Sequence, residues 1–238
     1  SASLIFPLIV GGIVIYAFLG DKIPGALGHR GFDIGYLAEV IFLSDRGLWG
    51  MLVSIASTTL AAFILFGSLL LHTGAGQTFF DLSARAGGKS PGGAAKIATI
   101  ASGLFGSISG SSVANIATTG NFTIPLMKRL RYPAPFAGAV EAVASTGGQL
   151  APPIMGTAAF VMAELVGVNY WNIAAVAVFP AFLFYLGVFT TIHLIAKRTG
   201  LGAVEQSELP DWRDAFNWYR MGPIVAGIAG LAFGIFNG

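Results

Sequence analysis

A polar, glycine-rich run interrupts apolar sequence at residues 106–120, GSISGSSVANIATTG. Apolar residues flank this run on both sides, so a membrane-embedded segment would place it inside the hydrocarbon layer. Backbone N–H and C=O groups in hydrocarbon need partners, and irregular backbone is tolerated there only where it lines a water-filled cavity or is buried in protein. The run therefore predicts a re-entrant helical hairpin whose tip, at Ser109–Ser112, binds an ion and part of a substrate.

The composition indicates a membrane protein. Hydrophobic residues make up 55% of the 238 residues and charged residues 10%, whereas about 25% of an average globular chain is charged. Glycine occurs 33 times, which suits close helix packing and broken helices in a bilayer. Cysteine is absent, which excludes disulfides and thiolate metal sites. The basic residues stand in small scattered groups, which are typical of topology signals and not of a nucleic-acid surface.

The apolar runs predict an all-α polytopic membrane protein with about five transmembrane crossings, one re-entrant helical hairpin and one broken helix. The crossings are expected at residues 3–19, 47–72, 134–166, 172–196 and 221–236. Amphipathic segments at 36–43, 76–86 and 198–220 are expected at the membrane interface. The N-terminal sequence SASLIFPLIVGG lacks the basic start of a signal peptide, so we expect the chain to begin inside a larger protein.

The charges predict which side of the membrane each segment faces. Segments 92–108 and 112–130 have Lys or Arg at both outer ends, so these ends share one side. Two full crossings joined by a tight turn would satisfy the same charges, but the polar run is longer than a turn needs. With a cytoplasmic N-terminus, ten of the 13 Lys and Arg lie inside, because only Lys22, Arg30 and Arg46 lie outside.

The predicted hairpin tip offers two kinds of polar group. The first helix ends there with carbonyl oxygens, and the second begins there with N–H groups. Ser109, Ser111 and Ser112 add hydroxyls, and Asn115 follows one turn later. Hard cations such as Na⁺ prefer such oxygen ligands. Alternatively, Gly106 and Gly110 serve only close helix packing, which would leave three serines and an asparagine unexplained.

A second polar interruption, STGGQLAPP, occupies residues 145–153. Pro152 and Pro153 lack N–H donors, and Pro152 disfavours helical geometry at Ala151. This predicts a crossing broken near its middle, although a simple proline kink is the alternative. Two interruptions in adjacent elements favour a shared site, which is the discontinuous-helix pattern of secondary transporters.

The titratable residues add one further candidate. Glu141 lies in apolar sequence and is a candidate ion or proton partner, although we favour a structural role in which it faces a neighbouring polar group. Glu164 is expected to be solvated near a span end. His72 and His193 are expected at the membrane interface and His29 in a loop, and no pair has metal-ligand spacing.

An intramembrane serine hydrolase is disfavoured. Its nucleophile elbow requires serine at the centre of G-x-S-x-G. Here Ile108 stands at the centre of the segment from Gly106 to Gly110. We therefore expect no enzymatic activity.

Two motifs carry a resemblance to a known family. The run SGLFGSISGSSVANIATTGNFTIPLMKRLRYP (102–133), followed by FAGAVEAVASTGGQLAPPIMG (136–156), resembles the large membrane subunit of tripartite ATP-independent periplasmic (TRAP) transporters. In particular it resembles the fused permease that works with a TAXI-type binding protein. The likeness extends over residues 20–220. It implies an elevator-type secondary importer driven by the sodium gradient, to which a periplasmic binding protein delivers an organic acid.

The resemblance also implies site residues. Sodium, as the coupling ion, would be bound by Ser109, Gly110, Ser111, Ser112, Asn115, Gly147 and Gly148. The substrate would contact Ser111, Ser112, Ser145, Thr146, Gln149 and Pro152. No cofactor and no other metal are expected.

The family fold contains two inverted repeats, and this sequence contains one hairpin and one broken helix. We therefore expect half of an elevator-type transporter, in a bacterial inner membrane. Expected partners are a TAXI-type binding protein, a small membrane subunit or its fused equivalent, the remaining half of the transport subunit and the organic acid. No nucleic acid is expected.

The expected divisions of the chain follow from this reading. They are N-terminal scaffold spans with a periplasmic loop (1–75), an interfacial segment (76–91), half of a transport domain (92–166), and scaffold spans with a cytoplasmic amphipathic linker (167–238). Two other readings remain open. One is an ion-coupled exchanger or efflux carrier that needs no binding protein, and the other is a truncated fragment that does not transport.

Overall fold

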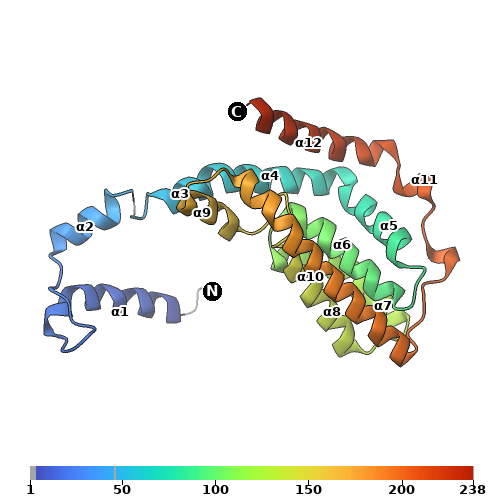
Figure 1. Ribbon diagram of the computed structural model, residues 1–238, viewed down its shortest axis with the longest axis horizontal. Coiled ribbons are helices and arrows are strands. Elements are labelled where there is room, and N and C mark those ends of the chain that lie inside the picture. The colour runs from blue at the N-terminus through green and yellow to red at the C-terminus, as the bar shows by residue number, and fades with distance from the viewer. Residues whose placement is uncertain (1–3, 46, 238) are drawn as a thin grey trace. The chain divides into compact units, whose positions relative to one another are not determined.

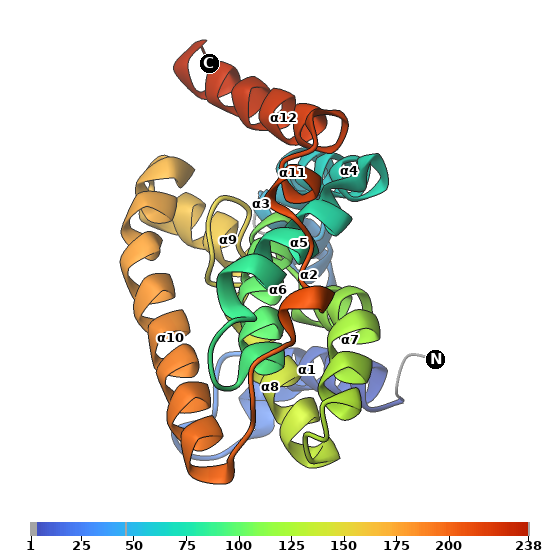
Figure 2. The ribbon, with the colours of Figure 1, turned by 90° about the vertical axis from the view of Figure 1, so that its right-hand side faces the viewer.

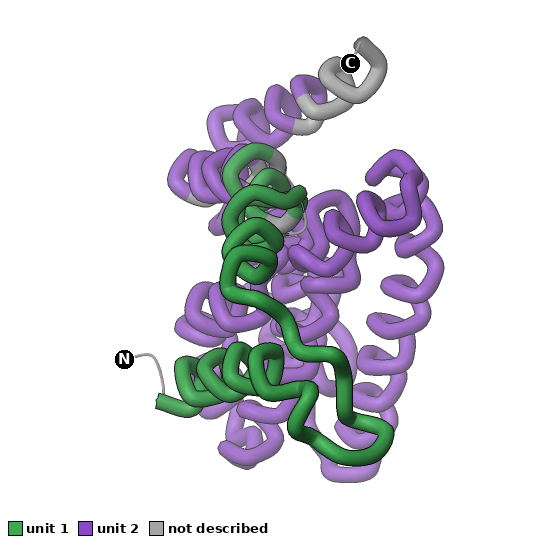
Figure 3. Tube along the Cα trace, turned by 90° about the vertical axis from the view of Figure 1, so that its left-hand side faces the viewer, with its two compact units in different colours: residues 1–59 green, residues 60–238 purple. Residues whose placement is uncertain are grey.

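The computed structural model describes residues 4–45 and 47–237, and these residues form helices joined by turns and loops (Figure 1). The prediction of an all-helical protein is therefore confirmed for the described part of the chain. The chain divides into two compact units, Ser1–Thr59 and Leu60–Gly238 (Figure 3).

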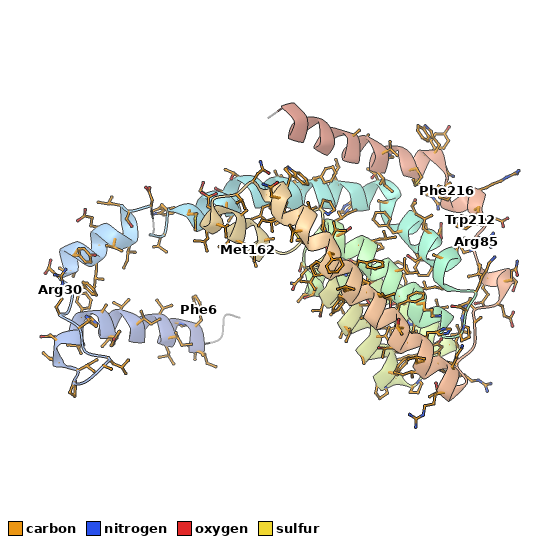
Figure 4. The ribbon with its side chains drawn as sticks, viewed as in Figure 1. Phe6, Arg30, Arg85, Met162, Trp212 and Phe216 are labelled. Carbon is orange, nitrogen blue, oxygen red and sulfur yellow. The ribbon has the colours of Figure 1, made fainter. Side chains whose placement is uncertain are left out.

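The first unit contains α1 (Ile5–Leu19), α2 (Ile34–Phe42) and α3 (Met51–Ile55). The loop after α1 folds back on that helix, because the Tyr16 hydroxyl donates to the carbonyl of Leu27 at 2.6 Å. The ring of His29 lies 3.2 Å from the carbonyl of Tyr16 and accepts the Gly31 N–H at 3.1 Å. This loop confirms the expected place of His29, and Arg30 extends from it (Figure 4).

The second unit holds the two predicted interruptions. Its helices are α4 (Ala61–Leu70), α5 (Gly76–Gly87), α6 (Gly93–Ser109), α7 (Ser112–Arg129), α8 (Ala134–Gly147), α9 (Thr157–Val166), α10 (Tyr170–Thr199), α11 (Trp212–Ala215) and α12 (Trp218–Asn237). π-Helical turns occupy Ala56–Leu60, which straddles the unit boundary, and Leu71–Ala75, and a 3₁₀ turn occupies Gln206–Glu208. The predicted helical segments 92–108 and 112–130 correspond closely to α6 and α7.

Helix α6 is the centre of this unit, with α5, α7, α8 and α10 packed around it (Figure 2). Its inward residues are small, and Ala94, Ala95, Ala98 and Ala101 are fully buried. Small side chains let neighbouring backbones approach closely, which is how membrane helices gain packing energy. The close packing of α6 fixes the position of its C-terminal end, where the hairpin turns.

Helix α10 runs along this unit from the loop after α8 to the start of α6. Near its N-terminus, the Tyr170 hydroxyl lies 2.7 Å from the carbonyl oxygens of Pro153 and Ile154. Near its C-terminus, His193 Nδ1 lies 2.9 Å from Nζ of the buried Lys96. Contacts at both ends of α10 therefore hold the break and the start of the hairpin against this helix.

Two described helices, Ile5–Lys22 and Tyr170–Thr199, are long and apolar enough to cross a membrane by themselves. The outer face of α10 exposes apolar side chains, among them Val176, Phe179 and Phe182. An apolar surface of this extent requires lipid or another protein to cover it. The crossings predicted at 47–72 and 134–166 are interrupted in the structure, and the one predicted at 221–236 lies within α12. The count of about five crossings stays a prediction.

The close approach of α6 to the end of α8 yields a stability prediction. A Cβ on Gly106 would lie 2.2 Å from the Cα of Gly148, which is backbone and cannot move aside easily. Gly106→Ala should therefore lower the free energy of unfolding by about 1–3 kcal/mol, the usual cost of overpacking. Thermal unfolding of the detergent-purified protein measures the change.

Gly138→Ala is the matched control, because Gly138 also lies in a helix, α8, and a Cβ at this position would have no atom within 4 Å. Alanine favours helix over glycine, so this variant should unfold at the wild-type temperature or slightly above it. Equal unfolding temperatures for the two variants would contradict the close approach.

Candidate functional site

The hairpin turn between α6 and α7 consists of two residues. Gly110 adopts a left-handed conformation with φ of 61°, which favours glycine, and its N–H donates to the carbonyl of Gly106 at 2.8 Å. Ser111 is the N-cap of α7, and its hydroxyl accepts the Ala114 N–H at 3.3 Å. Ser109 and Ser112 are the adjoining helix ends, so the predicted tip is confirmed as a feature of the fold.

The predicted broken helix is also present, because α8 ends at Gly147 and α9 begins at Thr157. The break starts later than predicted, since Ser145, Thr146 and Gly147 are helical. The positions of the prolines explain this. Pro152 and Pro153 cannot donate to the carbonyls four residues earlier, at Gly148 and Gln149, so the helix remains fully bonded up to Gly147.

The hairpin tip and the break are in direct contact. The Ile154 N–H donates to the carbonyl of Ser107 at 3.0 Å, which pairs the break with the last turn of α6. A Cβ on Gly110 would lie 1.9 Å from the carbonyl oxygen of Met155. The prediction that the two interruptions adjoin is therefore confirmed. Close packing at Gly106 and Gly110, the alternative interpretation, is present in the structure, and the ion site stays a prediction.

Asn115 lies behind the tip, buried between helices α6 and α8. Its side chain is 1% exposed, and Nδ2 donates to the carbonyl of Ser102 at 2.8 Å. The amide lies against the junction of Gly106 and Gly148, where a Cβ on either glycine would come within about 3 Å of Nδ2. Its Oδ1 is buried and has no hydrogen-bond donor among the described residues. A buried oxygen without a donor costs about 1–3 kcal/mol, and a bound cation would satisfy it.

The remaining predicted site residues divide into two groups. Ser111 and Gln149 line a pocket of about 750 Å³ whose other walls are mostly apolar, including Met155 and Met162. Pro152 is partly buried in the break. By contrast, the Thr146 hydroxyl donates to the carbonyl of Ala142 in its own helix, and Ser145 faces Glu141. Neither of these two hydroxyls joins the tip to the break.

Sequence reasoning missed three polar residues that surround Glu141. Ser102, Thr119 and Thr123 lie within hydrogen-bond distance of its carboxyl group, as does Ser145. The expected contact between Glu141 and a neighbouring polar group is therefore confirmed. The spacing of four from Asn115 to Thr119 to Thr123 places these side chains on one face of α7 and was readable from the sequence.

The other titratable residues point to no metal centre in the described part of the chain. Glu164 is exposed on α9, as expected, and His72 is exposed with Nδ1 2.8 Å from the carbonyl of Ser68. Within residues 4–45 and 47–237, no group of three or more His, Asp or Glu side chains is placed to hold a metal. A site for a hard cation would depend on the neutral oxygens at the tip.

A helical hairpin whose tip meets a broken helix, with helix ends converging on one point, defines a membrane transport protein of the discontinuous-helix class. Residues 2–237 match the family model of the tripartite ATP-independent periplasmic transporter, DctM component. The chain belongs to this family, which confirms the resemblance to the TRAP large subunit. The family consists of transporter permeases, in agreement with a chain that is not an enzyme. The TAXI variety stays a prediction.

Several named proteins are similar to this chain. The C4-dicarboxylate TRAP transporter large permease DctM of Pseudomonas aeruginosa is 31% identical over 150 residues, covering 63% of this chain and 35% of that protein. A putative TRAP large permease of Haemophilus influenzae is 26% identical over 241 residues, covering 98% and 55%. The isethionate TRAP permease DctMQ of Oleidesulfovibrio alaskensis is 29% identical, covering 62% and 24%. The chain thus spans about half or less of these relatives.

The contact between Gly110 and Met155 yields a second prediction. In Gly110→Ala, the new Cβ would collide with the carbonyl oxygen of Met155, and alanine would also have to adopt the left-handed conformation. The break should therefore detach from the hairpin. Hydrogen exchange of the Ile154 amide, which pairs with Ser107, should then become faster.

Gly167→Ala is the control for backbone strain alone. Gly167 also has positive φ, 71°, but a Cβ at this position would have no atom within 4 Å. Gly167→Ala has only the cost of a left-handed alanine, about 1–2 kcal/mol. It should leave the hydrogen-exchange rate of the Ile154 amide unchanged. Unchanged exchange at Ile154 in Gly110→Ala would show that the tip and the break do not depend on each other.

Proposed function

We propose that this chain is part of the large membrane subunit of a sodium-coupled TRAP transporter that imports a small organic anion. One observation carries the proposal. The hairpin tip and the helix break lie in direct contact, and behind them lies Oδ1 of Asn115, which has no donor among the described residues. A fold that gathers broken backbone and a buried free acceptor at one place is suited to bind a solute.

The oxygen atoms at the hairpin tip are suitable ligands for sodium. The C-terminal end of α6 brings carbonyl groups with partial negative charge to the tip, and Asn115 adds a buried amide oxygen. Gly148 lies against the Asn115 amide, and Gly147 precedes it at the end of α8. The neutral oxygens of Ser109, Ser111 and Ser112 complete the candidate ligand set.

The backbone N–H groups at the start of α7 are suited to bind an organic anion. Helix α7 begins at the tip and extends over 18 residues, so its first-turn N–H groups carry partial positive charge toward the tip. Ser111 and Gln149 are the polar side chains of the adjoining pocket. The names of two relatives specify C4-dicarboxylate and isethionate. Both are small organic anions, and the first of them supports the carboxylate class.

The same family supports the partners. The proposal includes a periplasmic binding protein of the TAXI type, a small membrane subunit or fused equivalent, and the remaining half of the transport subunit. The location is a bacterial inner membrane, with about five crossings and a re-entrant hairpin.

Residues 92–166 would move as a block in an elevator-type cycle, and the amphipathic segments would brace the motion. Contacts of α5 with Asp211, with Trp212 of α11 and with the first turn of α12 support this role. Arg220 pairs with Asp81 at 3.3 Å. Arg85 lies 3.7 Å from Asp211 and 5.5 Å from the ring centre of Trp212 (Figure 4).

Removal of a tip oxygen should weaken sodium binding. Ser111→Ala or Asn115→Ala in the full transporter should raise the sodium concentration for half-maximal uptake by about tenfold, since a lost bond to a charged group costs about 1.5 kcal/mol. Asn121→Ala is the control, because Asn121 is exposed on α7 and donates to Ala117 in its own helix. Sodium titrations of uptake into proteoliposomes distinguish the variants, and unchanged curves for both tip variants would refute the site.

The charge distribution predicts the topology. Arg131 and Arg30 are both exposed, and they are expected on opposite sides of the membrane. In intact cells, an impermeant thiol reagent applied outside should label Arg30→Cys and should reach Arg131→Cys only after the membrane is opened. Labelling of Arg131→Cys from outside would overturn the proposed orientation.

A further inference from the structure

Glu141 lies in a closed shell of hydroxyl groups where α6, α7 and α8 meet. The carboxyl side chain is 1% exposed. Oε1 lies 3.3 Å from the Ser102 hydroxyl and 3.2 Å from the Ser145 hydroxyl, and it also accepts from Thr119. Oε2 accepts from Thr123. Four hydroxyls from three helices therefore surround one buried acid.

No cationic side chain in the described part of the chain balances this acid. Helix α6 contributes Lys96, which bonds instead to Ser90 and lies beside His193 of α10. On α7, Lys128 and Arg129 are exposed in the last turn, and Arg129 pairs with Glu208. Helix α8 carries no other charged residue.

The remaining titratable group near the shell is Tyr185 of α10. Its hydroxyl donates to the carbonyl of Ala144 at 3.1 Å and makes no bond to Glu141. Burial of a carboxylate without a positive partner is costly even where hydroxyls donate to it, and a bound cation would offset this cost.

The hydroxyl shell selects the smallest cation. A metal ion separates its oxygen ligands, because it lies about 2.0–2.6 Å from each of them. Here the hydroxyls already donate to the carboxyl oxygens, so a metal ion would have to displace these hydrogen bonds. A proton bonded to Oε1 or Oε2 occupies no additional volume.

The shell accommodates the acid with and without a proton. When Glu141 is ionised, all four hydroxyls donate to it. When Glu141 is protonated, its O–H donates to a threonine oxygen, and that threonine turns its own hydrogen to a backbone carbonyl. Such carbonyls are in place, since Thr119 Oγ1 lies 2.9 Å from the Asn115 carbonyl and Thr123 Oγ1 lies 3.0 Å from the Thr119 carbonyl. Both states therefore leave every donor with an acceptor.

We infer that Glu141 is an exchangeable proton site, distinct from the sodium candidates at the hairpin tip. The proton reaches a carboxyl oxygen from hydronium and returns to water, so no other reactant is needed. The site is linked to the tip through shared residues. Ser102 contacts Glu141 with its hydroxyl and Asn115 with its carbonyl, and Thr119 contacts both Glu141 and the Asn115 carbonyl. Protonation at Glu141 thus reorients bonds that hold Asn115.

Infrared difference spectroscopy on the purified full protein tests this inference without any transport measurement. Spectra recorded in acidic and alkaline buffers should differ by a C=O stretch of a protonated carboxylic acid that disappears as the pH rises. Glu141→Gln, which keeps the shape of the side chain, should lose this band. Glu164→Gln is the control, because Glu164 is exposed, and it should keep the band.

Glu141→Asp keeps an acid in the shell and should show the band at a displaced frequency, which also covers the case in which the glutamine variant does not fold. Identical spectra for the wild type and Glu141→Gln, or for the wild type and Glu141→Asp, would overturn the inference. A band that persists unchanged at every pH would also overturn it, because the proton would then not exchange. Since the measurement needs neither substrate nor sodium, its failure is distinguishable from failure of the proposed function.

Discussion

The structure of the second unit depends on backbone hydrogen bonding between two broken helices. Hydrocarbon supplies no partners for backbone groups that leave a helix. The bond from the Ile154 N–H to the Ser107 carbonyl joins the break to the hairpin and pairs one such group on each side. Glycines at 106, 110 and 148 make this possible, because side chains at these positions would hold the backbones apart. The result is irregular polar backbone held at a fixed place within an apolar protein.

The interior of this unit contains more polar groups than the tip alone. Asn115, Thr119 and Thr123 form a polar stripe along α7, buried against α6 and α8. Buried polar side chains are tolerated when they are hydrogen-bonded, and the stripe meets this condition at nearly every atom. The exception is Oδ1 of Asn115, at the end nearest the tip. The stripe is therefore hydrogen-bonded along its length except at Oδ1 of Asn115, which lies next to the proposed sodium site.

The long helix α10 and the amphipathic segments form a second layer of support. Helix α10 contacts the break through Tyr170, α8 through Tyr185 and α6 through His193. Helix α5 is joined to the first turn of α12 by the ion pair of Asp81 and Arg220. These contacts connect the hairpin and the break to α10, whose outer surface is apolar.

The sequence by itself determined the helical class, the hairpin, the existence of the break and the family. These follow from local properties, namely apolar runs, a glycine-serine turn and a pair of prolines, which act within a few residues of where they stand. The start of the break was misplaced because Pro152 and Pro153 act on carbonyls four residues back, and the polarity of Ser145 and Thr146 was read as irregular backbone. Only the tertiary structure decided that Ser102, Thr119 and Thr123 surround Glu141, and that Met155 meets Gly110. These contacts join residues far apart in the chain, and the packing of α6 against α7 and α8 sets them, which no local pattern encodes.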